Sequence, residues 1–241
     1  PDPLDLYLLD LLPSVIEESK DKATKLVKPV NIKVKYTLRV KPNSVPPGEL
    51  VRCWLPYPSE TRDRQTDVEF ISASYENFIV SPFNSAHRSI YLEAIAEKDS
   101  PLVFEVVYKF KSYSEYNAID FNKKYTIDTS SELFAEYTAE RLPHIPFTDE
   151  LKQLSTKIIG TETEPIKKFK LIYEWINYNI PWAGALEYST IESLPTYCYT
   201  NKHGDCGIQS LLFITLCRMN GIPAKWQSGW MLHPPEVNLH D

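Results

Sequence analysis

Glycine and runs of like charge are scarce in this chain. It has only 7 glycines against 19 prolines and 15 tyrosines, so we expect proline turns and aromatic packing to shape many loops. Lysines and arginines are scattered among the acids and the formal net charge is -6, which argues against nucleic acid as a partner. The 43% apolar content of its 241 residues allows a large core and excludes disorder.

The N-terminus lacks the pattern of a signal peptide or of a membrane span. Its apolar stretch, residues 4–16, is interrupted by Asp5, Asp10 and Pro13, and no basic region precedes a small-residue cleavage site. The sequence begins without Met, which is compatible with a removed export signal. A periplasmic or secreted location is therefore our expectation.

Cysteines are too few and too dispersed to form a disulfide scaffold in a chain of this length. Cys53 and Cys217 lie in apolar runs and are expected to pack in the core. Cys198, His203 and Cys206 could in principle hold zinc, but short paired Cys spacings and a fourth ligand are missing. A carboxylate-rich calcium loop is also missing, so we predict no metal and no cofactor.

Residue periodicity divides the chain into a helical start, a β-rich part and a helical part. Residues 1–28 are predicted to be helical, and from Asn31 the apolar positions alternate as in a half-buried strand. Further strands are predicted over residues 50–55, 68–74, 89–95 and 102–110. Short, regularly spaced strands predict a β-sandwich over residues 29–128. Residues 129–241 form the second predicted domain, with helices over 131–140, 148–159 and 165–180.

The segment 204–223 is predicted to be one capped helix that carries a cysteine at its start. Asp205 can accept the free amides of the first turn, Gly221 suits the left-handed C-terminal position, and Pro223 prevents continuation. The sulfur of Cys206 then lies at the positive end of the helix, where the thiolate is favoured over the thiol. The same amides could stabilise an oxyanion on a carbonyl attacked by that sulfur.

A thiolate that performs acyl transfer also needs a base, and histidine titrates in the useful range. Residues 224–232 alternate with period two, which predicts a strand, and a second extended piece begins near Val237. A hairpin between these two pieces could return His240 to the N-terminal end of the cysteine helix. We therefore predict Cys206 as the nucleophile and His240 as its general base.

Residues 204–241 contain, in this order, the motifs Gly-Asp-Cys, Ser-Leu-Leu-Phe, Cys-Arg-x-x-Gly-Ile-Pro-Ala, Ser-Gly-Trp and His-Asp. This order of motifs resembles the transglutaminase-like superfamily. The resemblance implies a papain-like α+β core, in which a cysteine helix packs on an antiparallel sheet, with Cys206 and His240 catalytic. It also implies that residues 29–128 resemble the immunoglobulin-like region that often precedes bacterial members.

One departure from the family's pattern concerns the third catalytic residue. The family carries it on the strand after the histidine, whereas this sequence ends one residue past His240. Asp241 is a poor substitute because adjacent side chains in a strand point to opposite faces. We therefore expect the C-terminal strands of the core, and the third catalytic residue, to lie beyond Asp241 in the remainder of a full-length protein.

Other residues near the motif have open roles. Tyr199 or Asn201 could donate a second hydrogen bond to the oxyanion, and Trp230 could flank a substrate groove, although it could equally belong to the core. With water as acceptor the acyl-enzyme gives a peptidase or amidase, which we favour, acting on a peptide or protein amide. With an amine as acceptor it gives a glutamine transamidase. A noncatalytic peptide-binding module on the same fold is the third alternative.

Overall fold

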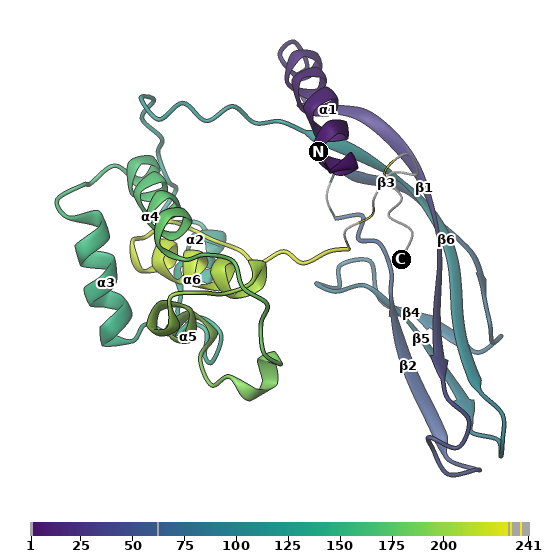
Figure 1. The fold of residues 1–241 in the computed structure, drawn as a ribbon. Coiled ribbons are helices and arrows are strands. Elements are labelled where there is room, and N and C mark those ends of the chain that lie inside the picture. Colours follow the sequence, from purple (N-terminus) through teal and green to yellow (C-terminus); the bar gives the residue numbers. More distant parts are fainter. Residues whose placement is uncertain (1, 62, 231, 233–236, 238–241) are drawn as a thin grey trace. The chain divides into compact units, whose positions relative to one another are not determined.

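The protein has a mixed α/β fold that separates into two compact units, one of residues 1–118 and one of residues 119–232 (Figure 1). The computed structural model describes residues 2–61, 63–230, 232 and 237. The expected domain bounds of 1–28, 29–128 and 129–241 remain a prediction. None of the described helices is long and apolar enough to cross a membrane.

The first unit begins with helix α1, Pro3–Ser19, which confirms a helical start, although the helix is shorter than predicted and residues 26–28 already belong to a strand. The side chain of Asp2 caps it by accepting a hydrogen bond from the amide of Leu4 at 2.8 Å. Val15 and Ser19 are buried, and the helix contacts strands β1 and β6. This helix therefore packs on the sheet through one narrow face.

Two three-stranded antiparallel sheets make up the rest of the first unit. One has the order β1-β6-β3 and the other the order β2-β5-β4. Their bounds are β1 Leu26–Val40, β2 Leu50–Pro56, β3 Gln65–Ala73, β4 Phe78–Val80, β5 Ser89–Ile95 and β6 Leu102–Glu115. The predicted strands are thus confirmed, and β4 was not predicted.

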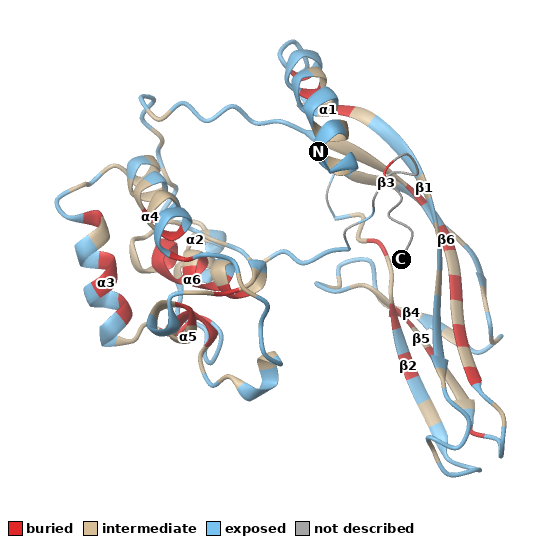
Figure 2. Cartoon of the chain, in the orientation of Figure 1, coloured by how far each residue is buried: buried red, intermediate tan, exposed pale blue. Residues whose placement is uncertain are grey.

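The core of the first unit takes inward side chains from both sheets. In β6 every second residue from Leu102 to Phe110 is buried, as the period of a strand requires (Figure 2). Leu55 of β2 and Leu92 of β5 join Phe104 of β6 in one hydrophobic cluster. Two sheets therefore share a core, but this topology does not confirm the immunoglobulin-like arrangement.

The described part of the second unit is mainly helical. Its elements are α2 Glu132–Thr138, α3 Asp149–Ile159, α4 Pro165–Asn179, the short 3-10 helix η1 Tyr188–Thr190, α5 Leu194–Asn201 and α6 Cys206–Met219. Side-chain caps begin four of them: Ser131, Thr148, Ser193 and Asp205 each accept a hydrogen bond from an amide of the first turn. Helices α2, α3, α4 and α6 confirm the predictions, whereas α5 was not predicted.

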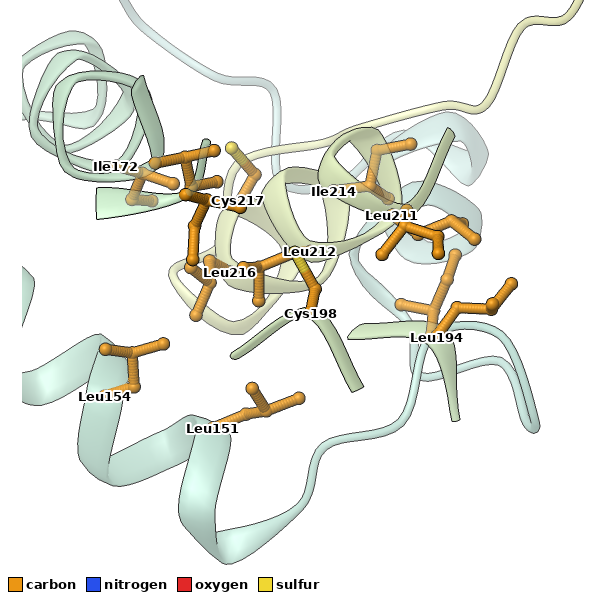
Figure 3. Packing of buried hydrophobic residues seen from close by; sticks show 14 of the residues in the cluster. Leu151, Leu154, Ile172, Leu194, Cys198, Leu211, Leu212, Ile214, Leu216 and Cys217 are labelled. Atoms are coloured by element: carbon orange, nitrogen blue, oxygen red, sulfur yellow. The ribbon is translucent and has the colours of Figure 1, made fainter. Parts of the chain in front are cut away.

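Helix α6 lies at the centre of the second core, because α2, α3, α4 and α5 all contact it. Figure 3 shows buried side chains of α3, α4 and α5 around those of α6. The cluster includes Leu151, Leu154, Ile172, Leu194, Cys198, Leu211, Leu212, Ile214, Leu216 and Cys217. The predicted packing role of Cys217 is thereby confirmed. Since α6 is fixed on several sides, the residue at its first position is held by the packing of the whole unit.

The end of α6 has the hydrogen bonds of a Schellman motif. Gly221 has a φ of 70° and its amide donates to the carbonyl of Arg218 at 3.0 Å, while the amide of Ile222 donates to the carbonyl of Cys217 at 3.0 Å. The predicted left-handed glycine is therefore confirmed. Arg218 itself is buried and donates from Nη1 to the carbonyl of Ala139 at 2.9 Å, next to α2.

The strand predicted over residues 224–232 is wrong for the residues that the structure describes. Residues 224–230 and 232 form no strand, and no sheet is present among the described residues of the second unit. An alternating sequence becomes a strand only where a partner strand exchanges hydrogen bonds with it. The antiparallel sheet that the papain-like core implies is likewise not seen in the described residues of the second unit.

Candidate active site

Cys206 is the first residue of α6 and the only exposed cysteine of the chain. Cys53, Cys198 and Cys217 are buried. Burial raises the pKa of the Cys198 and Cys217 thiols to about 12, so neither sulfur is available as a nucleophile near neutral pH. The structure thus leaves Cys206 as the thiol that can meet a substrate.

Asp205 caps α6 as predicted. Its Oδ1 accepts a hydrogen bond from the amide of Ile208 at 2.9 Å, and its carbonyl accepts the first intrahelical bond, from Gln209, at 3.0 Å. Helix geometry gives the amides of Cys206 and Gly207 no intrahelical acceptor. These two amides are therefore placed to face an anion that forms beside the sulfur.

Tyr188 of η1 reaches the same helix end from a separate part of the chain. Its hydroxyl donates to Oδ1 of Asp205 at 2.6 Å, so this carboxylate oxygen accepts from both the phenol and the amide of Ile208. Burial comes first among the causes that raise the pKa of Tyr188, followed by the hydrogen bond to Asp205. The phenol therefore remains a hydrogen-bond donor at neutral pH.

Gly207, directly after the cysteine, permits the close approach of that phenol. A Cβ atom built at Gly207 would lie 2.2 Å from the Tyr188 oxygen and 3.2 Å from its Cζ. No side chain fits at this distance unless the phenol moves. The absence of a side chain at residue 207 is therefore needed to seat Tyr188 against the start of α6.

The loop before the cysteine is fixed by Gly204. Its carbonyl accepts hydrogen bonds from the amide of Ala183 at 3.1 Å and from Nε2 of Gln209 at 2.9 Å. A Cβ on Gly204 would lie 2.8 Å from Cγ2 of Ile208, so this position also needs glycine. Backbone contacts on both sides of Asp205 thus define where the Cys206 side chain starts.

Tyr199 and Asn201, predicted as oxyanion donors, belong to α5 and have other contacts. The ring of Tyr199 lies under the Lys202 ammonium, with Nζ 3.7 Å from the ring centroid. The side-chain amide of Asn201 donates from Nδ2 to the carbonyl of Tyr197 at 3.0 Å. His203 meets the ring of Tyr197 edge to face, with 5.7 Å between the centroids. An oxyanion role for Tyr199 or Asn201 remains a prediction.

Trp230 is 63% exposed, and its role as a flank of a substrate groove remains a prediction. His240 lies outside the residues that the structure describes. A groove of about 380 Å³ does run along α6, and its lining includes Phe169, Ser210, Phe213, Cys217 and Trp226. The hydroxyl of Ser210 donates to the carbonyl of Cys206 at 2.6 Å, so the groove starts one helical turn from the nucleophile.

Tyr188 was not predicted from the sequence, because its hydrogen bond to Asp205 joins residues 17 positions apart. Gly207 was the single local signal for it, since a glycine inside the first turn of a helix calls for a close neighbour. The zinc alternative receives no support from the described residues, in which no three His, Cys, Asp or Glu side chains are grouped to hold a metal ion.

Comparison with known proteins finds one family and one similar solved structure. Residues 152–240 match the family model of the transglutaminase-like superfamily, whereas no curated protein matches the chain. The crystal structure of a "putative cysteine protease" from Cytophaga hutchinsonii has a TM-score of 0.61 and 17% sequence identity. The likeness covers 82% of this chain and 66% of that one, so this chain spans just under two thirds of its length. Residues 152–240 are thus similar to the transglutaminase-like superfamily, and the chain shares the fold of the Cytophaga hutchinsonii protein.

Proposed function

We propose that this protein is a cysteine enzyme that cleaves peptide or other amide bonds, with Cys206 as nucleophile and His240 as general base. One observation carries the proposal: Cys206 is exposed at the first position of α6, within the region that matches the superfamily. A cysteine that only packs is normally buried, as the other three cysteines are. The exposed position and the helix end suit a reactive sulfur.

In the proposed reaction the Cys206 sulfur attacks the carbonyl carbon of the amide after its proton has passed to His240. The amides of Cys206 and Gly207 donate to the oxyanion. The C–N bond breaks when His240 protonates the leaving nitrogen, which leaves a thioester. Water then loses a proton to His240, attacks the thioester and releases the acid, and the sulfur regains its proton.

The test is an assay of the protein against a peptide library, with and without an added primary amine. We expect cleavage products that carry one added water and that disappear in Cys206→Ala and His240→Ala. Cys53→Ala is the matched control, because it removes a buried thiol of the first unit and is expected to retain activity.

The product masses separate the alternatives. A product in which the amine replaces ammonia on a glutamine would identify a transamidase instead of a hydrolase. Saturable peptide binding without any turnover would identify a binding module. Turnover that is equal in wild type and Cys206→Ala would contradict the proposed chemistry.

A further inference from the structure

Tyr188 has no part in the proposed reaction, yet its hydroxyl lies at the start of the helix that carries the nucleophile. It donates to Asp205, and it occupies the space that a side chain at Gly207 would need. The phenol thus contacts the residues on both sides of Cys206, Asp205 before it and Gly207 after it.

A carboxylate next to a nucleophilic sulfur creates a difficulty. Asp205 is needed as the cap of α6, but its negative charge opposes the formation of a thiolate on the next residue. A hydrogen bond to a carboxylate from a neutral donor disperses part of that charge and fixes the direction of the oxygen. The Tyr188 hydroxyl is such a donor, at 2.6 Å.

We propose that Tyr188 is a positioning residue for Cys206, which holds the Asp205 carboxylate in its capping position and offsets its charge so that the thiolate forms. The role rests on the proposed function, because it matters only if Cys206 is a nucleophile. This role also requires glycine at residue 207, since any larger residue there displaces the phenol.

The test measures the rate at which iodoacetamide alkylates Cys206 across a range of pH, which needs no substrate. We expect Tyr188→Phe to slow alkylation about tenfold at neutral pH, the effect of one hydrogen bond to a charged group. The pH–rate profile should move to higher pH, a change that a merely structural role would not produce. Tyr91→Phe, which removes a hydroxyl bonded to Glu93 in the first unit, should leave the rate unchanged.

The variant Gly207→Ala and the double variant Gly207→Ala/Tyr188→Phe test the contact between residue 207 and the phenol. Gly207→Ala should slow alkylation as much as Tyr188→Phe does, because its Cβ would lie 2.2 Å from the phenol oxygen. In the double variant that oxygen is gone, and the new methyl meets ring carbons at 3.2 and 3.3 Å. We therefore expect the two substitutions together to cost little more than either one alone.

Asp205→Asn provides a conservative rescue, because the amide oxygen can still cap the helix while the charge is absent. Combined with Tyr188→Phe, it should restore much of the lost alkylation rate. If Tyr188→Phe alkylates at the wild-type rate at every pH, the positioning role is wrong. If it fails to fold, by circular dichroism, Gly207→Ala, which retains the hydroxyl, is decisive: a wild-type rate there overturns the role.

The two proposals fail in different ways. Slower alkylation in Tyr188→Phe, together with a peptide assay that shows no turnover dependent on Cys206, would support the positioning role and reject the amide-cleaving function. An unchanged alkylation profile, together with turnover that depends on Cys206, would reject the positioning role and leave the function intact.

Discussion

Nε of Arg218 donates to the carbonyl oxygen of Ala224 at 2.9 Å, which ties the end of α6 to the chain that follows the helix. The same guanidinium donates to the carbonyl of Ala139 at 2.9 Å and lies 5.8 Å from the ring centroid of Tyr137. A buried, charged side chain therefore joins three backbone segments by bonds that a planar fork of donors can make together.

Arg218→Lys should destabilise the second unit by about 2 kcal/mol, because the ammonium lacks the fork of donors that bonds the carbonyls of both Ala139 and Ala224, and a buried acceptor is left unpaired. Urea unfolding followed by far-UV circular dichroism would measure the loss. Arg39→Lys, at an exposed position on β1, is the control and should change little. Equal midpoints for the two variants would contradict the role of the buried guanidinium.

Alkylation of the native protein should modify Cys206 alone. The other thiols are buried, and burial raises the pKa of Cys53, Cys198 and Cys217, which disfavours the reactive thiolate. Peptide mapping by mass spectrometry after brief exposure to iodoacetamide should find a single labelled site. In denaturant all four cysteines should react. Early labelling of Cys198 in the native protein would show that the core around α6 opens.

Alkaline pH should destabilise the second unit. Burial raises the pKa of the Cys198 and Cys217 thiols from 9.0 to about 12, so the folded state keeps protons that the unfolded chain releases above pH 9. Their stabilising contribution is complete below pH 9 and is lost as the pH rises towards 12. Each thiol should lower the unfolding free energy by up to about 1.4 kcal/mol per pH unit in that window.

Urea midpoints from neutral pH to above pH 10 would show this slope. Cys198→Ala and Cys217→Ala should lower stability at neutral pH, because they leave cavities, but should flatten the alkaline slope. A slope that is unchanged in the double variant would assign the alkaline loss to other groups.

Gly221→Ala should cost about 1 kcal/mol, because the residue has a φ of 70° in the Schellman motif of α6. A Cβ there would meet no atom within 4 Å, so the cost is conformational and not steric. Gly184→Ala is the matched control: its Cβ also meets no atom, and its φ is not in the left-handed region. Thermal melting of both variants against wild type measures the difference.

Local signals in the sequence predicted most of the helices and strands. The cap at Asp205 and the left-handed glycine at residue 221 gave both ends of α6. The strand over 89–95 was predicted with its observed bounds, because apolar alternation and turn residues agree there. Helix α5 was missed, since its eight residues include Pro195 and lack an apolar period, although Ser193 is a cap signal.

Features that depend on long-range contacts could not be predicted in this way. The strand over 224–232 was wrong in the described residues because alternation does not supply a partner strand. Of the site, the exposed cysteine and its cap followed from the motif, whereas Tyr188 approaches through tertiary packing that no spacing rule contains. His240 stays a prediction from the motif alone.

The ladder between β1 and β6 pairs Leu26 with Glu115 and Val40 with Leu102, so its two strands are far apart in the chain. During synthesis β1 has to wait for β6 before it can pair, and closing so long a loop slows folding. The positive charges of Lys33, Lys35 and Arg39 make β1 a poor template for aggregation before it pairs with β6.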